Sequence, residues 1–301
     1  MAMVVAPTRI ALQNILVATD FSACAQTALN YGLGLARRYG GTLFTVNVMP
    51  HMPFVESSQP DPEKVKGFAQ QKLANMTASE PFKGIKHKEF IQEGEVGDVL
   101  SALVWENHID LIVLGTEGRT GLKKFLLGSV AEEIFRTAEC PVLTLGPHAS
   151  KLDSGLRHIL YATDFGPESI HGLPYALSLA EEHRARLTLL HVVTSTGVVL
   201  PEPEPGAMPV VEPYKAVETG EKQLRALIPA ESGLWHEPEY LVQFGPAAET
   251  ILRIAGKETD MIVLGVKRPA AMTKHMGGGV AYRIMCEAPC PVLSVGAGRQ
   301  R

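Results

Sequence analysis

The chain alternates between short, unbroken aliphatic runs and longer segments whose apolar residues recur at helical spacing. Unbroken Val, Ile and Leu runs are typical of strands that are covered on both faces, as in a parallel sheet. The alternation therefore predicts an α/β fold, with helices on both faces of a parallel sheet. In the first half we expect strands near 13–19, 42–48, 87–92, 110–115 and 141–146, and helices near 22–39, 62–78, 96–107 and 128–138.

The whole pattern occurs twice. The run Ile15–Phe21 (ILVATDF) returns as Ile159–Phe165 (ILYATDF), in each case followed by a segment with helical spacing. Two later runs return in the same order: Asp110–Gly115 as Asp260–Gly265, and Cys140–Gly146 as Cys290–Gly296. A repeated order of elements indicates two copies of one domain. We place the domains at 1–148 and 155–301, because Gly, Pro, Ser and charged residues replace the apolar pattern between them.

Composition narrows the function classes. A length of 301 residues suits two domains, and 46% hydrophobic with 20% charged residues is typical of folded chains. A net charge of −4 provides no overall positive field, so we expect no nucleic-acid partner. The absence of a long apolar run predicts no membrane span, and four cysteines without a secretory leader suggest the reducing cytoplasm.

A glycine-rich stretch follows the fourth strand of the first half. Two residues separate Gly115 from Gly118, and Gly128-Ser129 opens the next helix. Glycines permit positive φ and close backbone approach, and a helix N-terminus presents unsatisfied N–H groups to an anion. Three cations, Arg119, Lys123 and Lys124, lie within the stretch. The pattern predicts a phosphate site.

Phosphate contacts alone are too weak to hold a nucleotide. Each charge at a helix end contributes about 0.3–1 kcal/mol, whereas micromolar affinity needs about 8 kcal/mol. A base or sugar pocket must therefore contribute, and an open parallel sheet places its crevice at the carboxyl ends of its strands. Here those ends carry Ala18, Asp20, Asn47 and Val48. Asp20 could bind a ribose hydroxyl or a metal, or, like Ser22, cap the following helix.

The stretch 115–131, followed by Cys140-Pro-Val, resembles the ATP-binding members of the universal stress protein family, and the likeness covers nearly the whole chain twice. The resemblance implies two flavodoxin-like (Rossmann-like, HUP-type) domains with strand order 3-2-1-4-5. It also implies that the last strands of the two domains meet in an intrachain pseudo-dimer. The implied contacts are Ala18, Asp20 and the Val48 backbone for adenine and ribose, and Gly115, Gly118, Arg119, Gly128, Ser129 and Val130 for the phosphates.

Two departures from the family pattern affect this interpretation. Glu117 stands where many relatives carry His, which could weaken ATP binding or favour a bridging cation such as Mg²⁺ or Mn²⁺. In the second half, Arg268, Pro269 and Gly279 stand in place of Gly118, Arg119 and Ser129. We therefore expect ATP in the first domain only, although glycines 277–279 and nearby cations leave a different anion or head group open for the second.

The sequence thus predicts a non-catalytic, ATP-binding stress regulator with an unidentified protein partner. No P-loop and no base paired with a nucleophile is recognisable. One alternative is a slow metal-dependent ATPase, in which Asp20 and Glu117 hold the cation and Arg119 stabilises the transferred phosphoryl group. Another is an adaptor that binds a protein, lipid or small molecule through the second domain. A further homodimer stays open, as does a lid or docking role for the Pro-rich segments 50–62 and 197–213.

Overall fold

The computed structural model describes residues 10, 12–49, 61–116, 127–146, 155–194, 213–256, 258–267 and 279–296. The join between the halves and most of both Pro-rich segments lie outside these ranges. The strands of the first half are β1 (Asn14–Ala18), β2 (Thr42–Met49), β3 (Lys86–Glu93), β4 (Leu111–Gly115) and β5 (Val142–Leu145). Those of the second half are β6 (His158–Thr163), β7 (Arg186–Val193), β8 (Glu239–Phe244), β9 (Met261–Val266) and β10 (Val292–Gly296).

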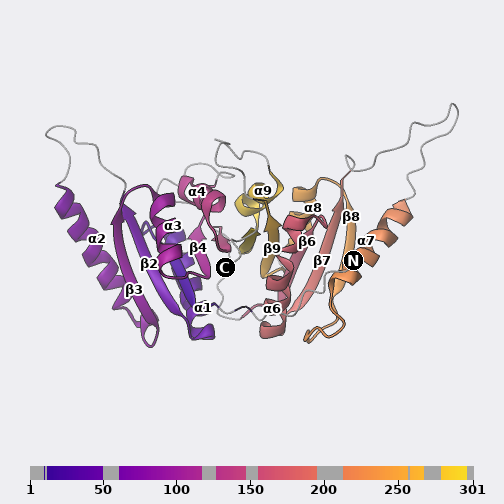
Figure 1. The fold of residues 1–301 in the computed structure, drawn as a ribbon, viewed down its shortest axis with the longest axis horizontal. Helices are drawn as coiled ribbons and strands as arrows, with labels where there is room; N and C mark the ends of the chain where they lie inside the picture. The colour runs from indigo at the N-terminus through magenta and orange to yellow at the C-terminus, as the bar shows by residue number, and fades with distance from the viewer. Residues whose placement is uncertain are drawn as a thin grey trace, which may run out of the picture.

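The described strands form one ten-stranded sheet in the order β3-β2-β1-β4-β5-β10-β9-β6-β7-β8. Each half therefore has the expected order 3-2-1-4-5, and the last strands of the halves meet at the centre (Figure 1). The pairing is parallel within each half and antiparallel between β5 and β10, with Leu143 opposite Leu293. The Thr144 hydroxyl donates across this seam to the Val292 carbonyl at 3.3 Å. The predicted pseudo-dimer is confirmed.

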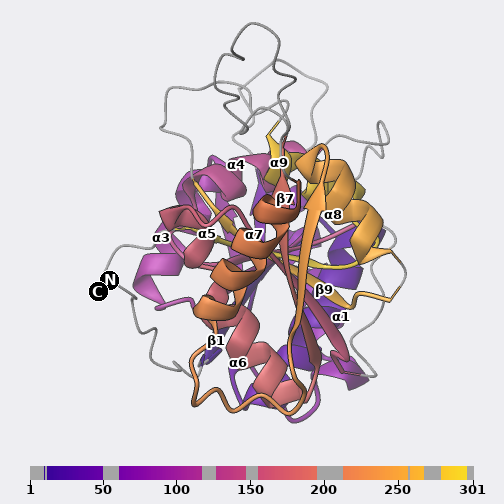
Figure 2. The same cartoon turned by 90° about the vertical axis from the view of Figure 1, so that its right-hand side faces the viewer.

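Helices cover both faces of the sheet. The first half contains α1 (Ala23–Tyr39), α2 (Pro62–Thr77), the 3₁₀ turn η1 (Glu80–Phe82), α3 (Val96–Glu106) and α4 (Ser129–Thr137). The second contains α5 (Pro167–Ile170), α6 (Leu173–His183), α7 (Pro213–Leu227), α8 (Ala247–Ala255) and α9 (Val280–Glu287). The helices α1, α2, α6 and α7 pack on one face, and α3, α4, α8 and α9 on the other. Figure 2 looks from the end of the second half and places α7 nearest the reader.

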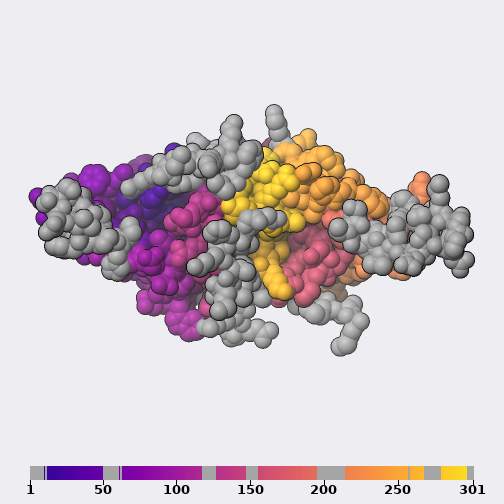
Figure 3. Space-filling model, turned by 90° about the horizontal axis from the view of Figure 1, so that it is seen from above, coloured from indigo at the N-terminus to yellow at the C-terminus, as the bar shows by residue number. Residues whose placement is uncertain are grey.

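The two faces have separate apolar cores, and each core runs through both halves. Ile15 and Val17 pack in one cluster together with Tyr161 of the second half, whereas Leu16 points to the other face, where Leu160 also lies. This alternation follows from the two-residue period of a strand. Because the cores are continuous, the halves form one elongated body, with the first half at one end and the second at the other (Figure 3).

The helical segment that follows β6 differs from its counterpart α1 in the first half. It is split into α5 and α6 around Gly172. Pro174 lies in the first turn of α6, where its missing N–H costs nothing, but inside a continuous helix it would remove a hydrogen bond. Gly172 also passes close to β9, since a Cβ added to it would lie 2.9 Å from the Gly265 nitrogen. The helix is therefore interrupted where the chain passes over β9.

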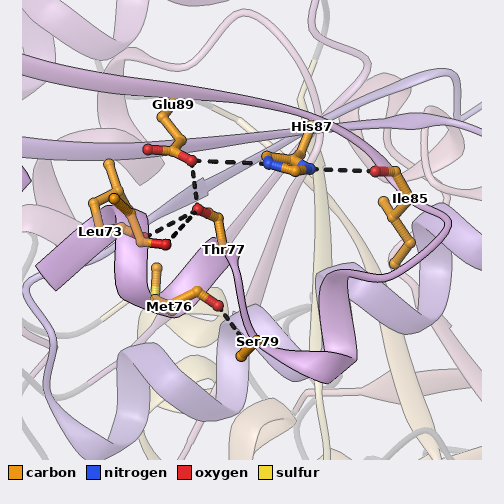
Figure 4. Close-up of polar contacts among 8 residues, drawn as sticks. Leu73, Met76, Thr77, Ser79, Ile85, His87 and Glu89 are labelled. Atoms are coloured by element: carbon orange, nitrogen blue, oxygen red, sulfur yellow. Dashed lines mark hydrogen bonds and ion pairs between the residues drawn. The ribbon is translucent and has the colours of Figure 1, made fainter. Parts of the chain in front are cut away.

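The outer edge of the first half is fixed by polar contacts between α2 and β3 (Figure 4). At the end of α2, the Thr77 hydroxyl is within hydrogen-bond reach of the Leu73 carbonyl at 3.2 Å and of the Glu89 carboxylate. His87 Nε2 lies 3.8 Å from the same carboxylate. These contacts hold α2 on an edge strand whose side chains are mostly exposed.

None of the described helices is both long enough and apolar enough to span a bilayer.

Candidate functional site

A cavity of about 160 Å³ lies at the carboxyl ends of β1, β2 and β4, where α3 and α4 begin. This is the edge at which an open parallel sheet usually binds its ligand. Its walls come from five places in the first half: the end of β1 with the turn after it, the end of β2, the start of α3, the end of β4 and the first turn of α4. The lining residues are Ala18, Thr19, Asp20, Ser22, Ala25, Val46, Val48, Val96, Leu114, Gly115, Gly128, Ser129, Val130 and Ala131.

The structure brings together most of the residues that the sequence assigned to ATP. Those on the cavity wall are Ala18, Asp20, Val48, Gly115, Gly128, Ser129 and Val130. The other two, Gly118 and Arg119, lie outside the described residues. Convergence from four separated segments on one cavity is the geometry that a binding site requires, and the contact of each residue with ATP remains a prediction.

The turn after β1 places Asp20 on the cavity wall. Phe21 has a φ of 64°, and its N–H donates to Thr19 Oγ1 at 3.0 Å. The Asp20 Oδ1 atom accepts from the Ser22 N–H at 2.9 Å, and Ser22 is the N-cap of α1, accepting from the Ala25 N–H at 3.2 Å. Ser22 thus caps α1, which is the role that the sequence suggested for it. Asp20 orders the turn, which fixes its carboxylate beside the cavity.

The end of β2 supplies an apolar wall and a structural tie. Val46 and Val48 line the cavity, while the intervening Asn47 is buried and donates from Nδ2 to the Thr19 carbonyl at 2.7 Å. This bond joins the ends of β1 and β2. Asn47 therefore shapes the site without lining the cavity.

The first turn of α4 supplies main-chain N–H groups. Gly128 is the N-cap, and no side chain caps the helix in the part of the chain that the structure describes. The first intrahelical bond runs from the Glu132 N–H to the Gly128 carbonyl, so the N–H groups of Ser129, Val130 and Ala131 precede it. These groups carry the positive end of the helix dipole, which favours an anion.

Gly115 and Gly128 do not use the positive φ that glycine permits. Gly128 has a φ of −57°, which any residue can adopt, and Gly115 is not among the glycines with positive φ. At Gly115 the reason is steric, because a Cβ there would lie 2.9 Å from the carbonyl carbon and the Cβ of Cys24 in α1. The close approach made by Gly115 is therefore to a helix of its own half.

A residue of the second half helps to position α4. The Leu127 N–H donates to the Tyr282 hydroxyl of α9 at 3.3 Å, and the next N–H, of Gly128, donates to the Thr116 carbonyl at 2.8 Å. Burial is the main cause that raises the pKa of Tyr282, so its hydroxyl stays neutral. The helices α4 and α9 lie side by side at the centre of the molecule (Figures 1 and 3). The start of α4 thus depends on both halves.

Several lining residues were not assigned to the site from the sequence. Thr19, Val46, Leu114 and Ala131 neighbour residues that were assigned, so the positions of the strand and helix ends could have indicated them. Val96 follows β3, and the rule that parallel strands end at one edge could have indicated it. No group of three or more His, Cys, Asp or Glu side chains within the described ranges could hold a metal ion, and Glu117 is outside them.

The sequence of the chain is similar to those of proteins from a single family. The model of the universal stress protein family matches residues 11–145 and again 155–296. Universal stress protein MJ0531 of Methanocaldococcus jannaschii is 30% identical over 138 residues, which is 44% of this chain and 81% of that protein. A protein of Staphylococcus aureus that is also named as a universal stress protein is 33% identical over 141 residues, which is 45% of this chain and 85% of that protein.

Two solved structures share the fold over nearly the full length. A universal stress protein of Archaeoglobus fulgidus superimposes with a TM-score of 0.67 at 19% identity, covering 95% of this chain and 98% of that one. A Pseudomonas aeruginosa protein of unknown function gives a TM-score of 0.59 at 18% identity, covering 96% of this chain and 94% of that one. At these identities the likeness concerns the fold alone.

Proposed function

Because the chain belongs to the universal stress protein family, we propose that its first half binds ATP and that nucleotide occupancy regulates the protein in a stress response. The observation that carries this proposal is the cavity at the ends of β1, β2 and β4, which is bordered directly by the first turn of α4, for which the described residues provide no side-chain cap. One wall is apolar and the opposite border offers N–H groups. A nucleotide has matching parts, a flat base and a chain of phosphates.

The size and lining of the cavity support a proposed arrangement of the parts of ATP. A volume of about 160 Å³ is below the ~300–1,000 Å³ of pockets that bury a whole drug-sized ligand. We therefore place the base inside, against Ala18, Val46 and Val48, and the phosphates outside, along the first turn of α4. Asp20 lies on the cavity wall, where it would accept from ribose hydroxyls. Base burial supplies the affinity that helix-end electrostatics alone does not.

Isothermal titration calorimetry with Mg-ATP tests the proposal on a matched pair of variants. Ala18→Leu adds three carbon atoms to the end of β1 inside the cavity, and we expect it to weaken ATP binding about tenfold or more, or about 1.4 kcal/mol. The control, Ala162→Leu, makes the same change at the equivalent end of β6. It should leave the ATP affinity unchanged.

The proposal fails if wild type binds no ATP, or if both leucine variants lose it equally. Circular dichroism and thermal melting show whether each variant is folded. Should Ala18→Leu not fold, the double variant Gly118→Arg, Ser129→Gly provides a second test, because it copies the second-half residues Arg268 and Gly279 into the first half. A folded double variant that binds ATP as wild type does would also contradict the proposal.

A further inference from the structure

The second half contains a larger cavity at the equivalent edge of the sheet. It measures about 740 Å³ and lies at the ends of β6, β7 and β9. Ala162, Thr163 and Asp164 line it as Ala18, Thr19 and Asp20 line the first cavity. Its volume falls within the ~300–1,000 Å³ of small-molecule sites. The two halves thus offer cavities of different size at the same position of the fold.

Substitutions between the repeats open the second cavity. Ala247 begins α8 where Val96 begins α3, which removes two methyl groups from the wall. Gly279 stands in the place of Ser129 and caps α9, which begins at Val280. The remaining wall is mainly aliphatic, with Leu190, Val192, Ile251, Leu264 and Val266 among its residues. Such a wall favours a ligand with an apolar body.

The charged groups among the described lining residues already have partners. Glu168 stands where the first half has Cys24, and Lys267 Nζ lies 4.0 Å from its Oε1 atom. Asp164 Oδ1 accepts from the Gly166 N–H at 2.9 Å. An anionic ligand would find the first N–H groups of α9, which precede its first intrahelical bond, from the Arg283 N–H to the Gly279 carbonyl. It would also meet two carboxylates at the border, one more than in the first cavity, and would share Lys267 with Glu168. An uncharged ligand avoids both costs.

One side chain among the described lining residues offers a directional contact that the first half lacks. Thr163 Oγ1 and Ser169 Oγ bond to each other at 2.8 Å. His191 takes the place of Asn47, and because a carbonyl only accepts, its Nδ1 must donate to the Thr163 carbonyl, which lies 2.9 Å away. In the neutral ring, Nε2 is then the acceptor. A ligand that carries an N–H or O–H group can donate to this atom.

We propose that the second-half cavity binds an uncharged, largely apolar small molecule that donates one hydrogen bond to His191 Nε2. Both cavities lie beside a helix that has no side-chain cap among the described residues, and the first half, proposed to bind a nucleotide, has the smaller cavity. The second half has a wider apolar cavity, a paired lysine and a histidine acceptor. The repeat therefore has two sites of different chemistry, and the second does not depend on whether ATP binds the first.

Two fluorescent probes with the same aromatic skeleton test the ligand class on the full-length chain. N-phenyl-1-naphthylamine is uncharged and carries one N–H donor, whereas 1-anilinonaphthalene-8-sulfonate adds a sulfonate. We expect saturable binding of the amine at one site per chain, and binding of the sulfonate about tenfold weaker. Excess Mg-ATP should not displace the amine. Equal or tighter sulfonate binding, no saturable amine binding, or displacement by ATP would overturn the proposal.

Variants locate the probe in the cavity. Ala247→Trp fills the wall at the start of α8 and should weaken amine binding at least tenfold, while the matched Val96→Trp change in the first half should not. His191→Asn copies the first-half residue, keeps a donor for the Thr163 carbonyl and should weaken amine binding about threefold to tenfold. If Ala247→Trp does not fold, Ala162→Leu serves instead. Amine binding that responds to Val96→Trp but not to the second-half variants would contradict the site.

Discussion

Gly115 and Gly265 are glycines because a helix crosses each strand at these points. A Cβ at Gly115 would lie 2.9 Å from backbone and side-chain atoms of Cys24, and one at Gly265 would lie 2.2 Å from the Glu168 carbonyl oxygen. Gly32 serves similarly inside α1, where a Cβ would lie 2.7 Å from Val17. At this scale the first cavity is shaped by steric fit between its own elements, before any ligand is present.

We expect Gly115→Ala to lower the free energy of unfolding by about 1–3 kcal/mol, because the added methyl group overlaps backbone that has little room to shift. Gly265→Ala should cost more, since the overlap is closer. Urea unfolding at equilibrium measures both. The control is Gly67→Ala in α2, where the residue is exposed and nothing lies within 4 Å, and it should stabilise by about 0.5–1 kcal/mol. A Gly115→Ala variant as stable as wild type would refute this steric account.

At the scale of elements, α4 and α9 are equivalent helices with similar starts, although α9 begins one residue later in the repeat, since Gly279 stands in the place of Ser129. Each has a glycine N-cap without a side-chain cap, at backbone angles that suit any residue: −57° and 148° at Gly128, and −72° and 149° at Gly279. A capping residue such as Asp or Ser would stabilise either helix. No described residue caps either helix with a side chain, so within the described part of the chain the first N–H groups are available to a ligand, which at α4 is the proposed phosphate chain.

The variant Gly128→Asp should therefore separate stability from binding. We expect a gain of about 0.5 kcal/mol in unfolding free energy, because the carboxylate caps the helix and complements its dipole. ATP affinity should fall about tenfold, because the same carboxylate occupies the phosphate site and repels the phosphate groups. Gly279→Asp is the matched change, with space for its Cβ, and should stabilise equally with no effect on ATP. Calorimetry and urea unfolding provide both readouts, and unchanged ATP binding in Gly128→Asp would contradict the phosphate assignment.

At the scale of the whole molecule, the halves are joined by more than the β5–β10 pair. On one face, α1 and α6 meet, and Arg38 of α1 donates to the Glu182 carbonyl at the end of α6. The neighbouring His183 accepts at Nδ1 from the Leu156 N–H at 3.2 Å. Burial, with a smaller contribution from Arg38, lowers the pKa of His183 to about 4. The seam between the halves therefore contains a histidine that is neutral when the protein is folded.

This histidine should make stability fall in acid. The unfolded chain binds a proton at His183 near its ordinary pKa of ~6.5, whereas the folded chain does so only near pH 4. Stability is therefore fully present above about pH 6.5 and decreases as the pH falls toward 4. Because the side chain is partly exposed and solvent screens its charge, we expect the loss of unfolding free energy to be about 1 kcal/mol. His183→Gln should remove this loss in urea unfolding, while the exposed His236→Gln should behave as wild type. Equal acid sensitivity of all three proteins would exclude His183 as the cause.

Much of the fold could be predicted because its signals are local. The expected helix at 96–107 is observed at Val96–Glu106, and the expected strand at 42–48 at Thr42–Met49. Hydrophobic period, capping residues and glycine spacing depend on neighbours along the chain, so they are readable from it. The internal repeat indicated two copies of one domain, whereas the strand order and the pseudo-dimer were implied by the resemblance to the universal stress protein family. The residues placed at strand ends met at one cavity because parallel strands end at one edge.

Contacts between distant residues could not be predicted in this way. The sequence by itself determined the repeat, the order of the elements and the edge of the sheet at which a ligand would bind. Only the tertiary structure decided that Gly115 makes room for Cys24, that Tyr282 supports the start of α4 and that the second half has the larger cavity. The physical reason is that steric fit and cavity volume depend on which side chains come into contact across the fold, and local sequence patterns contain no information about those contacts.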